Sequence, residues 1–106
     1  MPKYLLRANY TESGLNGLIK EGGSKRREAA TKAIEGLGGK VEAFYYGFGD
    51  DDAYVILESP DDVTAAAVCL AVGASGAVTT STTALLSPED VDAAIKKSVD
   101  YRPPGG

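Results

Sequence analysis

The segment from Val41 to Leu57 constrains the fold more than any other part of this 106-residue chain. Four of the eight aromatic residues stand in it before a turn of glycine and aspartate, and a fifth follows that turn. Aromatic and β-branched residues fill strands, whereas Gly and Asp are favoured where two strands reverse direction. The segment therefore predicts a β-hairpin whose second strand ends near Glu58.

The length and composition indicate one globular domain. A chain of this size buries roughly 65% of its unfolded surface, which is enough for one modest core. The apolar content of 43% and the charged content of 25% are ordinary for a globular protein. The net charge of −4 argues against a nucleic-acid partner, because phosphate contacts need a basic surface.

The sequence offers few groups for catalysis or for an address in the cell. It has no histidine, and its single cysteine, Cys69, lies in an apolar run that predicts a small buried side chain. We therefore expect no cofactor and no metal. No segment approaches the ~20 apolar residues of a membrane span, and no leader is visible, so we expect no membrane partner and a cytoplasmic location.

The other segments alternate between strand and helix signals. A strand is expected from Lys3 to Tyr10. Ser24, Ser59 and Ser87 are each expected to cap the start of a helix. The remaining expected elements are a helical turn at Leu15–Ile19, a helix from Ser24 to about Leu37, a helix opened by Ser59-Pro60-Asp61-Asp62, a strand at Gly76–Leu86, and a helix opened by Ser87-Pro88-Glu89-Asp90 with Val91, Ala94 and Ile95 inward. Residues 99–106 are expected to form an extended tail, because two adjacent prolines exclude a helix there.

This order predicts an α+β fold, a ferredoxin-like βαββαβ sheet with an extra C-terminal helix. The helices would cover one face of the sheet, and the other face is too apolar for open water. The residues expected there include Leu5, Phe44, Tyr46, Phe48, Tyr54 and Ile56. Two such faces packed together would make a dimeric α/β barrel.

The helix from Val63 to Ala74 points to association as well. Nearly all of its residues are apolar and small, so it needs cover on more than one side. We therefore expect a homodimer or a higher even-numbered homo-oligomer in which this helix meets another subunit.

Several motifs resemble the GYD domain family. They are a Tyr4–Thr11 strand ending in Asn9-aromatic-Thr11, the link Leu37-Gly38-Gly39-Lys40, the pair Phe44-Tyr45, the motif Gly49-Asp50-x-Asp52, Pro60-Asp61-Asp62, and a threonine-rich last strand. The resemblance implies a ferredoxin-like dimeric barrel over nearly the whole chain and names no reaction. The tyrosine after the glycine-acid pair of the family is Asp51 here, so a role of that tyrosine would be lost or pass to Tyr54.

Two charged clusters are candidate ion sites. Asp50-Asp51-Asp52 could offer oxygen ligands to a hard cation, but turn formation is the favoured interpretation, since no further ligands stand at set spacing. Ser24, Lys25, Arg26 and Arg27 place cations at a helix start, where they oppose the helix dipole and could hold a phosphate or carboxylate. A solvated surface with ion pairs to Glu21 or Glu28 is the favoured interpretation there too.

The third candidate site is the barrel interior. There we expect Arg7, Asn9, Tyr46, Tyr54, Thr80 and Thr82 to converge on a small organic molecule or anion. Apolar cavities with a few polar groups are typical of ligand sites. The same residues could instead form satisfied cross-strand pairs at a dimer seam.

Three functions are compatible with these features. The leading hypothesis is a small homo-oligomeric binding protein with an interior pocket. The first alternative is a cofactor-free oxygenase or isomerase, with Tyr46 or Tyr54 as acid or base and Arg7 stabilising an anion. The second is a structural assembly subunit with a filled interior.

Overall fold

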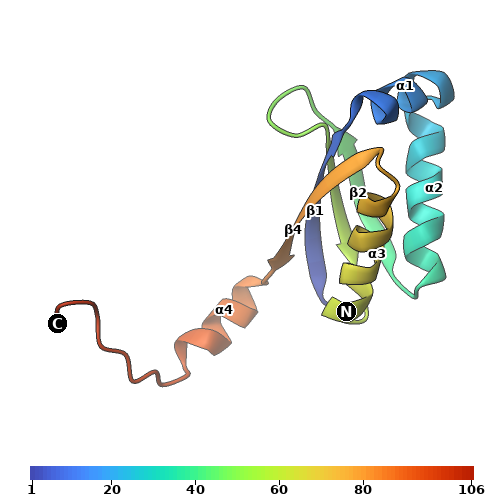
Figure 1. The fold of residues 1–106 in the computed structure, drawn as a ribbon. Coiled ribbons are helices and arrows are strands. Elements are labelled where there is room, and N and C mark those ends of the chain that lie inside the picture. The colour runs from blue at the N-terminus through green and yellow to red at the C-terminus, as the bar shows by residue number, and fades with distance from the viewer.

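The computed structural model describes all residues from 1 to 106, and Figure 1 shows its elements. In chain order these are β1 (Lys3–Tyr10), α1 (Glu12–Glu21), α2 (Gly23–Gly36), β2 (Lys40–Tyr46), β3 (Ala53–Glu58), α3 (Asp62–Ala74), β4 (Val78–Leu85) and α4 (Pro88–Ile95). The sheet order is β2-β3-β1-β4, and every neighbouring pair is antiparallel. The predicted α+β ferredoxin-like topology is confirmed; in the single chain the sheet is open and does not close into a barrel.

Strand β1 lies at the centre of the sheet and divides it into two faces. Tyr4, Leu6 and Ala8 are buried beneath the helices, while the residues between them point to the other side. The nine buried apolar residues of the core are Tyr4, Leu6, Ala8, Ile34, Ala53, Val55, Leu57, Ala65 and Val78. Helices α2 and α3 cover this core on one face only, and the opposite face carries no element of the chain (Figure 1).

Helices α1 and α2 differ from the expected boundaries. The expected turn at Leu15–Ile19 is part of a ten-residue helix that Thr11 caps by accepting a hydrogen bond from the Gly14 amide. Gly22 separates the two helices, because its φ of +93° suits glycine and not other residues. It also serves as the N-cap of α2, so the prediction that Ser24 caps this helix is wrong.

Helix α3 begins two residues later than a serine cap would place it. The carboxylate of Asp61 accepts a 2.8 Å hydrogen bond from the Thr64 amide, and this bond lowers the pKa of Asp61. The buried Ser59 hydroxyl instead donates to the Asp61 carbonyl at 2.9 Å. The prediction of a Ser59 cap is therefore wrong, because two suitable cap residues stand close together and the second one is used.

Strand β2 contains an irregularity that changes which residues face the helices. Its register against β3 shifts between Val41 and Ala43. A β-bulge of this kind adds a residue and reverses the alternation that follows it. Phe44 and Tyr46 consequently face the helices, and the prediction that they lie on the open face is wrong. Phe48 lies in the loop after β2 with its side chain fully exposed.

Helix α4 and the tail extend away from the body of the molecule (Figure 1). The capping box of Ser87 and Asp90 is present as predicted. The expectation that Val91, Ala94 and Ile95 point inward is wrong, because all three are exposed and Ile95 keeps 75% of its surface. The radius of gyration is 16.9 Å, whereas a compact chain of this length has about 13 Å.

No helix of the structure has both the length and the apolar character that crossing a bilayer requires.

The start of α3 is also joined to the first strand. The side chain of Tyr4 is buried, and its hydroxyl donates a 2.5 Å hydrogen bond to the Asp62 carboxylate. This hydrogen bond, burial, and the negative charge of Asp62 raise the pKa of Tyr4 to about 12. The contact fixes the N-terminal end of α3 over the core.

The close approach of α1 to the start of β4 gives a first prediction. A Cβ atom on Gly14 would lie 2.0 Å from the Ala77 carbonyl oxygen, so the backbone would have to move. We expect Gly14→Ala to lower the free energy of unfolding by about 2–3 kcal/mol, measured by urea denaturation. Gly17→Ala in the same helix is the control: nothing lies near its Cβ position, and alanine should stabilise the helix by about 0.5–1 kcal/mol. Equal effects of both changes would contradict this packing.

The Tyr4 to Asp62 contact gives a prediction for alkaline pH. The folded state holds the Tyr4 proton more tightly than the unfolded state, whose tyrosines titrate near the ordinary value of 10.0. The resulting stability is fully present below pH 10 and is lost as the pH rises toward about 12. Urea denaturation between pH 8 and pH 11 should therefore show a shallower loss of stability for Tyr4→Phe than for the natural chain. In an Asp62→Asn background, Tyr4→Phe should have little further effect on this pH dependence; a full effect there would contradict the assignment.

Candidate functional site

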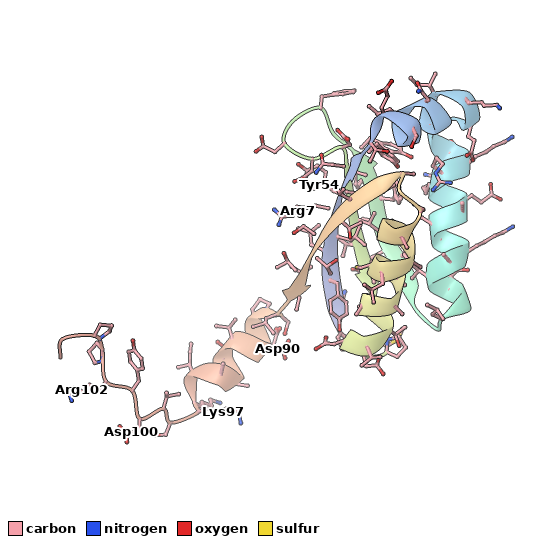
Figure 2. All side chains as sticks on the ribbon, in the orientation of Figure 1. Arg7, Tyr54, Asp90, Lys97, Asp100 and Arg102 are labelled. Atoms are coloured by element: carbon pink, nitrogen blue, oxygen red, sulfur yellow. The ribbon has the colours of Figure 1, made fainter.

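Arg7 lies on the open face of the sheet, midway along the central strand. It is directly opposite Tyr54 on β3 and Ser81 on β4. One terminal nitrogen, Nη2, donates a 3.2 Å hydrogen bond to the Ser81 hydroxyl. The Nε atom is buried and has no hydrogen-bond partner. Figure 2 shows Arg7 and Tyr54 near each other on the side of the sheet away from α2 and α3.

The charge of Arg7 is not neutralised within the chain. The two ion pairs of the structure join Lys3 to Glu42 and Arg26 to Glu21, and neither includes Arg7. Leu5 and Ile56 are both half-buried and lie opposite each other on the same face. They are two residues away from Arg7 and Tyr54 along β1 and β3. A guanidinium without an acidic partner beside apolar side chains is a strong binding group for a carboxylate or phosphate.

The hairpin loop is fastened to the end of β1 beside this face. Asn9 donates a 2.8 Å hydrogen bond from its amide to the Asp51 carboxylate, and the Tyr10 backbone amide donates a 2.9 Å hydrogen bond to Asp52. Asp51 therefore binds the loop to the sheet. Asn9 lies at the edge of the face with its amide already engaged.

The acidic loop does not gather its carboxylates at one point. Asp51 and Asp52 bind different groups of β1, and Asp50 is exposed together with Gly49. This arrangement agrees with a role of the aspartates in forming and anchoring the turn. Gly49, Asp50 and Asp52, the residues of the expected motif, lie in the loop that borders the open face.

The structure brings together only half of the residues expected in the interior. Arg7, Asn9 and Tyr54 share the open face, whereas Tyr46, Thr80 and Thr82 lie on the face covered by helices. The expected convergence of all six residues is therefore wrong. Thr80 pairs with Ala8, and Thr82 pairs with Leu6, both of which point into the core. The hydroxyls that share the face of Arg7 belong to Thr79, Ser81 and Thr83.

The reason for this error is the uniform sequence of the strand. Five consecutive hydroxyl residues, from Thr79 to Thr83, carry the same kind of group to both faces, so only the register against β1 separates them. On the covered side, the Thr82 hydroxyl lies 2.9 Å from the sulfur of the half-buried Cys69. One signal in the sequence separates the two faces. Val78, the apolar residue at the start of the strand, belongs in the core, and alternation from it places Thr80 and Thr82 on the same side.

Tyr46 occupies a different environment from the one expected. Its hydroxyl donates a 3.0 Å hydrogen bond to the Gly23 carbonyl at the start of α2. Burial, with a smaller contribution from the neighbouring Tyr10 hydroxyl, raises the pKa of Tyr46 to about 12. Tyr46 therefore stays protonated at neutral pH and is not available as a base beside Arg7.

The four residues at the start of α2 point in different directions. Ser24 and Arg27 line a shallow polar surface on the outside of the helix with Glu28 and Lys32, whereas Arg26 faces the space between α2 and α3. Lys25 is exposed. No side chain caps this helix. The expected anion site therefore does not form as one cluster of four.

An apolar pocket of about 160 Å³ lies between α2, α3 and the covered face of the sheet. Thirteen of its 14 lining residues are hydrophobic, and the remaining one is Arg26. The pocket opens to solvent along α2, where its lining residues Ala29 and Ala33 are exposed. No motif pointed to this pocket, because its walls consist of ordinary Ala, Val and Ile residues of two separate helices.

Comparison with known proteins identifies the family. The family model of the GYD domain matches residues 4–95, a range that runs from β1 to the end of α4. No curated protein and no solved structure matches the chain. Since the match covers most of the 106 residues, the chain belongs to the GYD domain family.

Proposed function

We propose that this protein is a homodimer that binds a small organic anion between two sheets packed through their open faces. The observation that carries the proposal is Arg7, whose charge has no acidic partner and whose Nε atom is buried without a hydrogen bond. Burial of a charge without a partner is costly, so closure of the interface over Arg7 calls for a ligand with negative charge. Tyr54 and the hydroxyls of β4 supply further hydrogen-bonding groups on the same face.

The exposed surface of the single chain supports association. It measures 7416 Å², about a third more than the roughly 5,600 Å² expected for a monomer of this mass. Only 11 of the 106 residues are buried, so the core inside one chain is small. Pairing through the open face would cover Leu5, Ile56 and Tyr54, and it would also give α4 a surface to contact.

The outer side of α3 supports a further contact. Val63 and Leu70 lie on it with 79% and 74% of their surfaces exposed. Contact through this helix, in addition to the sheet face, would produce a tetramer. This observation favours the assembly role as the second candidate function. An enzyme would have Tyr54 as its one acid or base beside Arg7, since Tyr46 lies on the other face.

The interface can be tested by placing a charge on the open face. We expect Ile56→Lys to convert the dimer to a monomer in sedimentation velocity experiments at micromolar concentration, because two lysines would be buried against each other. Ile19→Lys is the matched control: Ile19 is 80% exposed on α1, and the change should leave the dimer intact. A dimer that survives Ile56→Lys would exclude this interface. If the natural chain forms a tetramer, Leu70→Lys should convert it to a dimer. A tetramer that persists in this variant would exclude α3 as a shared surface.

The ligand can be tested by native mass spectrometry of the purified protein. We expect an even-numbered oligomer that carries a reproducible extra mass, and we expect Arg7→Gln to lose it, because the amide keeps the polarity but removes the charge. Arg102→Gln in the exposed tail is the control and should retain the mass. An oligomer of the natural chain without extra mass would favour the assembly role, and an extra mass that persists in Arg7→Gln would place the ligand elsewhere.

A further inference from the structure

The pocket between α2 and α3 lies on the opposite side of the sheet from Arg7. Its floor is formed by buried side chains of three strands, among them Leu6, Val55 and Val78. Its walls come from α2 and α3, which lie on the same side of the sheet in Figure 1. It is therefore separate from the proposed anion site of the open face.

The pocket exists because the residues of α2 that line it are small. Ala29, Ala30 and Ala33 face Val68 and Val72 of α3. A larger residue at any of these positions would fill the space from one wall, as happens in ordinary cores. Its volume is close to that of an engineered apolar cavity of about 150 Å³ that binds benzene. Unlike that cavity, the pocket is open to solvent beside the exposed Ala29 and Ala33. The pocket thus has room for one compact ring.

Its composition selects the chemistry of the ligand. Phe44 of β2 lines the sheet side of the pocket, and its ring meets the ring of Tyr46 edge to face with centroids 5.3 Å apart. Tyr10 of β1 is a second aromatic residue on this side. Aromatic rings pack favourably against aromatic side chains in offset or edge-to-face arrangements.

Arg26 is the single charged residue of the pocket. Its guanidinium reaches Glu21 only at 3.9 Å, and both side chains remain partly exposed, so this ion pair is weak. Apart from Asp62 in its first turn, α3 carries no charged residue, so no second countercharge faces Arg26 from the opposite wall. A carboxylate could replace the contact with Glu21 and form two parallel hydrogen bonds with the guanidinium.

We propose that this pocket is a second ligand site, which takes a small aromatic carboxylate with its ring between Ala30 and Val72 and its carboxylate on Arg26. The site is independent of the dimer and of Arg7. Its two parts make different contributions: the apolar walls select the ring, and the arginine selects the negative charge.

The test uses benzoate and the neutral benzyl alcohol as probes in NMR titrations of the full-length protein. We expect benzoate to shift the signals of Ala30 and Val72 saturably. Arg26→Gln should weaken benzoate about tenfold, the effect of one lost charge-assisted interaction, and should leave benzyl alcohol nearly unchanged. Arg27→Gln is the matched control and should affect neither probe. The absence of saturable shifts at Ala30 and Val72 would overturn the proposal.

Two filling variants test the pocket from opposite walls. Ala30→Leu and Val72→Phe should each abolish binding of both probes while keeping or raising the melting temperature, because the larger side chains would occupy the pocket and cover its apolar lining. Ala67→Leu on the exposed side of α3 should leave binding unchanged. If both filling variants lower the melting temperature, or if neither affects binding, the inference is wrong. Loss of benzoate binding in Arg7→Gln would also overturn it, and would place the probe on the open face, where the proposed dimeric site remains valid.

Discussion

The alternation of side chains along β1 determines most of what this protein can do. Because β1 pairs with both β3 and β4, its register assigns every residue of three strands to one of two faces. Tyr4, Leu6 and Ala8 pack beneath the helices, so the side chain of Arg7 lies on the open face. A slip of one residue would bury the guanidinium in the core and expose the buried tyrosine. The position of the candidate anion site is thus a direct consequence of the packing of the core.

The sheet has different chemistry on its two sides, and each side has an arginine without a strong acidic partner at its candidate site. On the open face, Arg7 lies among half-buried apolar side chains and exposed hydroxyl side chains, and no element of the chain covers it. On the covered face, Arg26 lines a pocket that a single chain forms by itself. The first proposed site depends on a second copy, whereas the second depends only on the small residues of α2. Binding to one site therefore need not affect the other.

The sequence was sufficient for the order and type of the elements, because turn residues and helix caps are local signals. The capping box at Ser87 is an example, since both of its partners lie within four residues. Face assignments required tertiary information. The bulge beside Ala43 places Phe44 and Tyr46 on the covered side. In β4, five consecutive hydroxyl residues give no indication of which ones face the helices. The interhelical pocket was equally invisible, because empty space between two helices has no local pattern.

The connection between β4 and α4 consists of only two residues, Leu86 and Ser87. Since β4 is held by eight residue pairs to β1, the direction of α4 is set by the end of a rigid strand. In the proposed two-fold dimer, any contact that the arm of one copy makes with the other copy would be repeated by the second arm. One substitution at such a contact would therefore change the dimer interface at two places, while α4 itself buries no residue in the single chain.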